Sequence, residues 1–204
     1  MDKWTKIPEL PVIEKTVKAL KLNNIDTSVV KNKEEAKKKV LELIPQGSEV
    51  MTMTSETLNS LGILSEINDS GKYNSIRNML NSLDRTTQSL EMQKLGAAPQ
   101  YTIGSVHAVT EDGKVIIASN TGSQLAAYVY GSEHVIWVVG AQKIVKDIDE
   151  GIKRIYEHTL PLESERVKKA YGMPHSAINK LLIVNKEVKP NRVTMIIVEE
   201  VLGF

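Results

Sequence analysis

A nearly continuous apolar segment at residues 134–139 constrains the fold more than any other part of the sequence. A strand with one face in water alternates apolar and polar residues, whereas this segment has valine, isoleucine and tryptophan at consecutive positions. Strands of that kind are typical of parallel sheets that are covered on both faces. Gly140 ends the segment. The chain is therefore expected to form a sheet with further structure on both sides.

Helical and strand-like patterns alternate along the first half of the chain. Apolar residues at helical spacing mark helices, and Pro45 and Gly47 end one of them. Thr54 or Ser55 can cap a short helix. Because strands that alternate with helices form parallel sheets, we expect a mostly parallel arrangement. The first helix is predicted to end near residues 23–24, and three further helices cover 36–44, 54–62 and 76–95. The predicted strands cover 26–30 and 49–53.

The second half adds an antiparallel part. Asp112-Gly113 lies between two strand-like runs, which is a strong signal for a hairpin. The last two strands are expected to form a second antiparallel pair, joined by a turn at residues 189–191. The fold class predicted for residues 1–204 is therefore a single α/β domain. The predicted strands are 101–109, 114–119, 134–139, 181–184 and 193–198, and the helices are 125–130, 144–155 and one that starts at Pro161.

Composition limits the chemistry that the chain can perform. It has 204 residues and a formal net charge of +1, which gives no global argument for binding nucleic acid. It contains no cysteine, so disulfides, thiolate metal sites and a cysteine nucleophile are excluded. Its four histidines lack the spacing of metal ligands, and no cofactor motif is found. Neither a leader segment nor a membrane span is predicted, so a cytoplasmic location is expected.

Polar residues follow three of the predicted strands. Ligands bind beyond the carboxyl ends of strands in open α/β sheets, where hydroxyls, free N–H groups and a lysine can hold an anion. Each group also has a simpler explanation: a helix cap, a plain turn or a surface lysine. The candidate ligand-binding residues are Ser55, Thr57, Asn120, Thr121, Gly122, Ser123, Gly140, Gln142 and Lys143.

Two residues of the predicted hairpin are candidates for catalysis. His107 could act as a general acid–base, and it could equally be a structural histidine that is held by hydrogen bonds. Glu111 lies at the turn, where an exposed carboxylate needs no function. No nucleophile elbow of the hydrolase type is present.

The order of these motifs resembles the LUD-domain (lactate-utilisation) family. The resemblance rests on residues 104–113 (GSVHAVTEDG), 120–123 (NTGS), 138–145 (VVGAQKIV) and 198–204 (VEEVLGF). Earlier landmarks at residues 44–47 and 55–58 fall in the right order, so the match covers nearly the whole chain. The positions that match are His107, Thr110, Glu111, Asp112, Gly113, Thr121, Gly122, Ser123, Gly140 and Lys143.

The resemblance implies a sugar-phosphate-isomerase or CoA-transferase-like α/β fold and a role around the oxidation of L-lactate to pyruvate. Many short relatives carry a cysteine-rich segment before the last strands, which residues 172–180 replace here without cysteine. Direct electron transfer by this chain is therefore in doubt. By analogy with the fold, Glu111 would be the nucleophile or base.

Three functions are consistent with these features. The chain could bind a small anionic metabolite, with Thr121, Ser123 and Lys143 holding a phosphate or carboxylate. It could instead be a non-enzymatic scaffold subunit of a lactate-oxidising iron–sulfur complex, or a relative whose pocket has lost its function. Whether it is an enzyme stays open. The first hypothesis requires Glu111, Ser123 and Lys143 to converge on one pocket.

Overall fold

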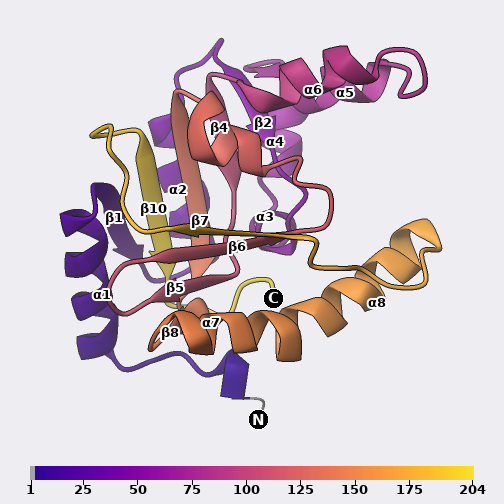
Figure 1. Cartoon of the computed structure of the whole chain (residues 1–204). Helices are drawn as coiled ribbons and strands as arrows, with labels where there is room; N and C mark the ends of the chain where they lie inside the picture. The colour runs from indigo at the N-terminus through magenta and orange to yellow at the C-terminus, as the bar shows by residue number, and fades with distance from the viewer. Residues whose placement is uncertain (1–2) are drawn as a thin grey trace.

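Two β-sheets form the framework of the protein, whose computed structural model describes residues 3–204 (Figure 1). The strands are β1 Ile25–Val30, β2 Glu49–Thr52, β3 Asn74–Ser75, β4 Tyr101–Gly104, β5 Ala108–Thr110, β6 Val115–Ser119, β7 His134–Gly140, β8 Ile144–Val145, β9 Lys180–Val184 and β10 Val193–Val198. The larger sheet has six parallel strands in the order β1-β10-β7-β4-β2-β3. The smaller has the order β8-β5-β6-β9, in which β6 is antiparallel to both neighbours.

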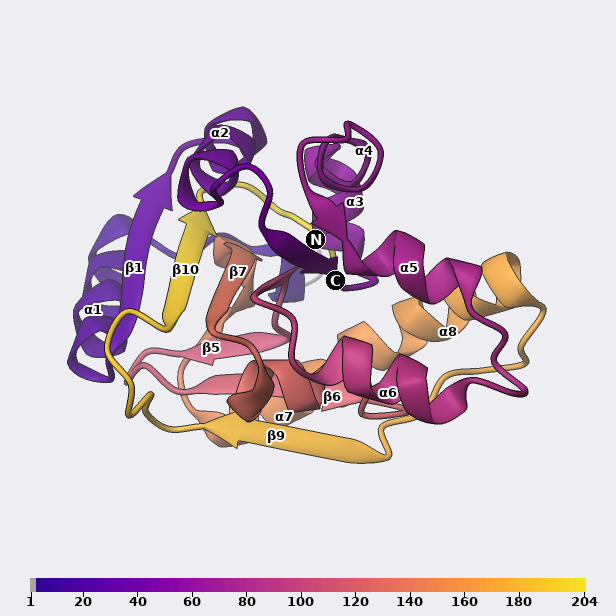
Figure 2. The same ribbon diagram turned by 90° about the horizontal axis from the view of Figure 1, so that it is seen from above.

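Helices and the small sheet cover the two faces of the large sheet. The α-helices are α1 Leu10–Leu22, α2 Lys33–Leu43, α3 Glu56–Leu61, α4 Leu64–Asn68, α5 Ile76–Ser82, α6 Ser89–Ala97, α7 Ile148–Arg154 and α8 Leu160–Tyr171. Single 3₁₀ turns lie at Lys3–Thr5 and Ala141–Lys143, and π-helical turns lie at Ala127–Gly131 and Ile155–Thr159. Helices α2, α3 and α4 lie on one face, and the small sheet lies on the other (Figure 2). The outer face of the small sheet packs against α7.

Strand β7 lies in the middle of these layers. Trp137 and Val139 belong to the core between the two sheets, and Ile136 and Val138 belong to the core under α2–α4. Trp137 is fully buried. Consecutive apolar residues therefore serve opposite faces, which confirms that the segment forms a strand covered on both sides.

Side-chain caps set the starts of several helices. Asn32 caps α2, Ser55 caps α3 and Asp147 caps α7, each accepting a hydrogen bond from the backbone N–H three residues later. Gly62 ends α3 in the left-handed conformation, with φ of 60°. The cap prediction for Ser55 and the helix end at Gly62 are therefore confirmed.

The bounds of the elements differ from the sequence predictions in three places. The strand predicted over 101–109 divides at Ser105 because β4 joins the large sheet and β5 the small one. The helix predicted over 76–95 divides into α5 and α6, since Asp84 accepts hydrogen bonds from Thr86 and Thr87 in a turn between them. Ile144 begins β8, so the predicted helix starts at Ile148.

The last two strands do not form the predicted antiparallel pair. Strand β9 pairs with β6 in the small sheet, whereas β10 lies between β1 and β7 in the large sheet and is parallel to both. The apolar pattern of β10 explains the difference. Its residues are almost all buried, while β9 is exposed to half-buried, and only an interior position in the large sheet buries both faces of a strand.

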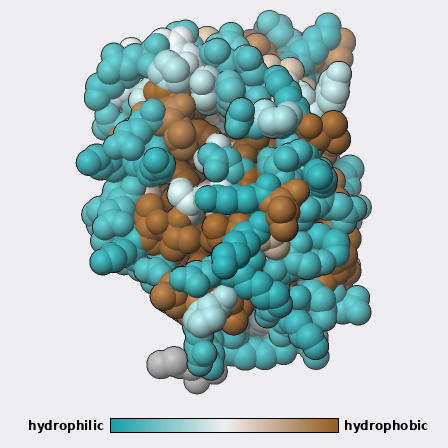
Figure 3. Space-filling model, turned by 90° about the vertical axis from the view of Figure 1, so that its left-hand side faces the viewer, coloured by the Kyte–Doolittle hydropathy of each residue, from teal (hydrophilic) through white to brown (hydrophobic). Residues whose placement is uncertain are grey.

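One edge of the large sheet is formed by β1. Figure 3 views this side of the molecule, where hydrophobic side chains lie in patches among hydrophilic ones. Val29 of this strand is partly exposed, and Asp26 near the start of the strand is exposed. A charged residue on an edge strand disfavours pairing with another sheet. No described helix is both long and apolar enough to cross a membrane.

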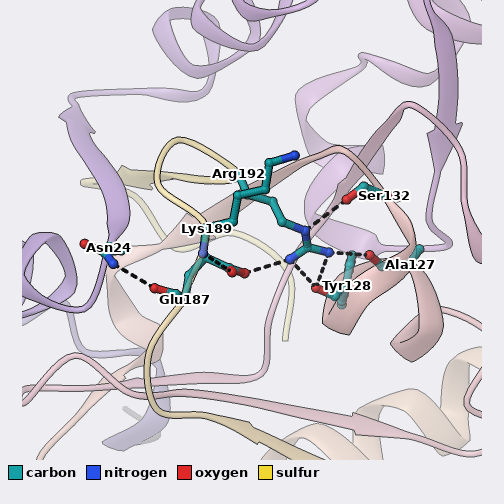
Figure 4. A network of polar contacts seen from close by, with 7 residues as sticks. All are labelled: Asn24, Ala127, Tyr128, Ser132, Glu187, Lys189 and Arg192. Carbon is teal, nitrogen blue, oxygen red and sulfur yellow. Dashed lines mark hydrogen bonds and ion pairs between the residues drawn. The ribbon is translucent and has the colours of Figure 1, made fainter.

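Arg192 links the start of β10 to the turn that precedes β7 (Figure 4). Its buried guanidinium donates hydrogen bonds to the carbonyls of Ala127, Tyr128 and Ser132 at 3.0–3.1 Å. It also pairs with Glu187 at 2.8 Å. The Ala127 carbonyl also accepts the Ser132 N–H at 3.2 Å, and Arg192 supplies donors to the other two carbonyls at this turn.

The Arg192→Met variant is expected to lower the free energy of unfolding by about 3 kcal/mol, because it leaves Glu187 and the carbonyls without their partner. Urea denaturation measures this change. Arg85→Met is the matched control, since Arg85 is exposed and its replacement should change stability by less than about 0.5 kcal/mol. Equal effects of the two variants would contradict a structural role for Arg192.

Candidate functional site

A buried lysine lies just beyond the carboxyl end of β7. Lys143 ends the short turn Ala141–Lys143 between β7 and β8, and it is 3% exposed. Its Nζ lies within 3.2 Å of three oxygens: Thr57 Oγ1, Ser105 Oγ and the carbonyl of Val106. We call Thr57, Ser105 and Lys143 the Lys143 cluster. It joins the start of α3 to the segments that follow β4 and β7, beyond the carboxyl ends of these two strands.

Residues 200–203 cover the cluster from one side. Thr57 donates a hydrogen bond to the Leu202 carbonyl at 3.3 Å, and Gln142 is bonded to both the N–H and the carbonyl of Leu202. A side chain at Gly140 would meet Leu202 N at 2.7 Å, and one at Gly203 would meet Thr57 Oγ1 at 2.5 Å. Glycine at these two positions therefore lets the chain pack closely against the site.

The environment of Lys143 disfavours its charged form. Burial lowers the pKa of Lys143 well below 10.5, and the nearby Arg154 guanidinium lowers it further. The oxygens around its amine are two hydroxyls and a carbonyl, and none of its contacts among residues 3–204 is a carboxylate. A lysine in such surroundings can act as a base or nucleophile, or it can take a proton when an anion arrives.

His107 lies beside this cluster and is hydrogen-bonded within the small sheet. Its Nδ1 accepts a hydrogen bond from the backbone N–H of Ala118 at 3.1 Å, and its carbonyl accepts one from Arg154 at 2.7 Å. Burial, with Lys143 and Arg154, lowers the pKa of His107 to about 3. The imidazole is therefore neutral at neutral pH and accepts a hydrogen bond within the small sheet, in agreement with the structural alternative.

Glu111 is not part of the Lys143 cluster. Its carboxylate pairs with Lys15 of α1 at 2.8 Å, and its backbone N–H bonds to Val145. Lys143 reaches back to Val106, five residues before Glu111 in the chain. Glu111 thus contacts α1 and β8, and no hydrogen bond found among the described residues joins it to the Lys143 cluster.

The neighbouring hairpin residues have structural roles. Gly113 has φ of 82°, and a side chain there would meet the backbone of Ala19 at 2.6 Å. Thr110 is bonded to Asp112 and accepts the Lys114 N–H at 2.9 Å. This part of the motif thus shapes a turn that packs closely on α1.

The turn at residues 120–123 forms its own hydrogen bonds. Gly122 N–H bonds to Ser119, Ser123 N–H bonds to Thr121 Oγ1, and Asn120 accepts from Asn179. A side chain added at Gly122 would meet Lys180 Cδ at 2.7 Å, so the Lys180 side chain packs directly over this glycine. No contact found among the described residues joins this turn to Lys143, so Ser123 and Lys143 do not meet either.

Of the predicted ligand-binding residues, the structure thus brings together Thr57 and Lys143, with Gln142 and Gly140 packed on the covering segment. Ser55 caps α3. Sequence reasoning overlooked Ser105 and Leu202. A hydroxyl after a strand that ends in glycine is a weak signal, and nothing local indicates that Leu202 returns to Thr57. In the described part of the chain, no group of three or more His, Asp or Glu could hold a metal ion.

The large parallel sheet, the small mixed sheet and the polar cluster at the strand ends together define a two-sheet α/β protein. The family model for the LUD domain matches residues 13–198, so the chain belongs to the LUD-domain family. Its fold is similar to the crystal structure of a DUF162 family protein from Deinococcus radiodurans, with a TM-score of 0.59 and 11% identity over 95% of this chain and 99% of the other. No curated protein matches the sequence. Family membership supports a role related to lactate utilisation.

The depressed pKa of His107 predicts acid sensitivity. The unfolded chain binds a proton at this residue near pH 6.5, while the folded protein binds it only near pH 3. The folded state therefore has its full stability with respect to His107 above pH 6.5, and it loses stability as the pH falls toward 3, because the unfolded chain takes up the proton first. Between pH 7.5 and 5 we expect His107 to account for about 1 kcal/mol or more of lost stability.

Urea denaturation of His107→Gln and the wild type at both pH values measures this loss. The variant should lose less stability between them than the wild type. His175→Gln is the control, because His175 is exposed. An identical pH dependence in wild type and His107→Gln would contradict the prediction.

Proposed function

We propose that the protein binds a small anionic metabolite at the Lys143 cluster, in a role related to lactate utilisation, and that the carboxylate of L-lactate or pyruvate is the group it recognises. One observation carries this proposal. The Lys143 amine is buried at the end of the central strand, and its hydrogen-bond partners are two hydroxyls and a carbonyl, none of them charged.

An anion would supply the opposite charge that these partners lack. A carboxylate beside Lys143 would favour the ammonium form and make charge-assisted hydrogen bonds with it. Arg154 adds positive charge nearby, since it is close enough to lower the pKa of Lys143. Ser105 is only half-buried and is the member of the cluster nearest to solvent. We infer that a ligand would reach the amine past Ser105.

Oxidation of lactate releases electrons, and the chain has no cysteine to hold a cluster that accepts them. We propose iron–sulfur lactate-utilisation subunits as the partners that would accept electrons. In this arrangement the LUD-domain chain would supply the binding site for the organic acid, whether or not it also takes part in the chemistry.

Ligand binding is expected to depend on Lys143. A ligand at 100 times its Kd should raise the free energy of unfolding by about 2.7 kcal/mol, which thermal denaturation detects. L-Lactate, pyruvate, sugar phosphates and CoA esters are the ligands to compare. Lys143→Met should weaken binding by about 10- to 100-fold, because it removes a charged hydrogen-bond donor.

Lys146→Met is the matched control, since Lys146 is exposed and lies three residues away. It should bind like the wild type. Absence of any ligand-dependent shift in the wild type would overturn the proposed function, as would a shift that persists unchanged in Lys143→Met.

Binding is also expected to take up a proton. The pKa of Lys143 is low in the free protein, and a bound anion would raise it. Above the free pKa, affinity should therefore fall about tenfold per pH unit until the bound pKa is reached. Isothermal titration calorimetry in two buffers of different ionisation enthalpy measures the proton uptake. Binding with no proton uptake over the whole range would show that Lys143 does not change its charge.

A further inference from the structure

Ser105 places a primary hydroxyl against the buried amine. Its Oγ lies 3.2 Å from Lys143 Nζ and 3.2 Å from Thr57 Oγ1. Thr57 Oγ1 in turn lies 3.2 Å from Lys143 Nζ. A nucleophile, a base within hydrogen-bond reach and a third group that orients the base are the components of a serine-type catalytic centre.

The oxygens around Lys143 can satisfy an uncharged amine, which its burial favours. The Val106 carbonyl can only accept, and the Thr57 hydroxyl can give its hydrogen to the Leu202 carbonyl, so both can accept hydrogens from Lys143. A neutral amine has two hydrogens and one lone pair. If the amine is neutral and gives its two hydrogens to Val106 and Thr57, its lone pair is left for the Ser105 hydroxyl, which otherwise donates to the Val106 carbonyl at 3.4 Å. In that state the amine can remove the proton from serine.

We propose that Ser105 and Lys143 form a catalytic dyad for acyl transfer, with Thr57 as a positioning residue, acting on an ester or thioester of a small carboxylic acid. The dyad uses the same cluster as the proposed function but does not require an anion to bind there.

The reaction is balanced by the dyad and its substrate. Ser105 Oγ attacks the carbonyl carbon of the ester, and its proton moves to Lys143 Nζ. When the tetrahedral intermediate collapses, the bond to the leaving oxygen or sulfur breaks and Lys143 returns the proton to that atom. Water or another acceptor then attacks the acyl-Ser105 ester by the same route, which restores the free hydroxyl and the neutral amine.

Crowding around Ser105 indicates a short acyl group. A side chain at Gly104 would lie 1.7 Å from the Tyr128 hydroxyl, so this tyrosine packs directly on the backbone before Ser105. Tyr128 also donates a hydrogen bond to the Ser105 carbonyl at 3.4 Å. On the other side, Gly203 packs against Thr57. Little room is left for a long chain beside the hydroxyl.

The groups that face Lys143 keep its amine available as a base. Arg154 of α7 opposes a second positive charge there, and His107 is neutral near neutral pH. From α3 and β4 the amine meets only the hydroxyls of Thr57 and Ser105. Activity should thus rise with pH along a limb that lies well below pH 10.5, the ordinary pKa of lysine.

The test is acylation of the purified protein by p-nitrophenyl acetate, followed by nitrophenol release and by mass spectrometry of the intact chain and its peptides. One acetyl group should appear on Ser105. Lys143→Met should slow its formation by about 10²- to 10⁴-fold and remove the rising limb of the pH profile. Thr57→Val should slow it and shift the midpoint, and Thr57→Ser should restore both.

Ser105→Ala should abolish the adduct, and Ser105→Cys should regain one, which shows that the site is folded. Ser82→Ala is the matched control, since Ser82 is exposed on α5. Acetylation that maps elsewhere, or that persists at the wild-type rate in Ser105→Ala or Lys143→Met, would overturn the dyad.

The two proposals fail separately. A change in thermal stability with L-lactate or pyruvate, without acetylation of Ser105, would support anion binding and reject the dyad. Acetylation of Ser105 without that change in stability would support the dyad and reject anion binding. If both hold, L-lactate or pyruvate should slow the acetylation, because a bound carboxylate favours the protonated form of Lys143, which cannot act as a base.

Discussion

The burial of β7 on both faces is the constraint on which the rest of the structure depends. Trp137 and Val139 need a layer on one side, and Ile136 and Val138 need one on the other. The small sheet and helices α2–α4 are those layers. Because the backbone leaves β7 directly into a short turn under the small sheet, the turn carries Lys143 into the interior, and a lysine far from water acquires unusual chemistry.

The sequence predicted the elements better than their partners. The buried strand at 134–139, the hairpin turn and the Ser55 cap each depend on residues close together in the chain, and each is confirmed. The division of residues 101–109 and the separation of β9 from β10 depend on which sheet each strand joins, which no local pattern encodes. For the same reason the contact of Thr57 with Lys143, 86 positions apart, was not predictable as a pair.

The site combines a hydrophobic setting with few, well-placed oxygens. Burial among neutral groups weakens the charged form of this amine, so the ligand that arrives can change its protonation state. A carboxylate selects the ammonium, whereas a neutral ester leaves the base free to act. The residues that match the family at the hairpin turn serve another purpose, since Gly113 and Thr110 shape the contact with α1.

The position of β10 has a consequence for biosynthesis. This strand pairs with both β1 and β7, yet it is made after all the other strands of both sheets. Until it emerges, β1 has no neighbour in the large sheet, and the apolar side chains of β7 lack one flank. Such non-local pairing slows folding and leaves strand edges open to association. The nascent chain is therefore expected to need protection from aggregation until residues 193–198 have left the ribosome.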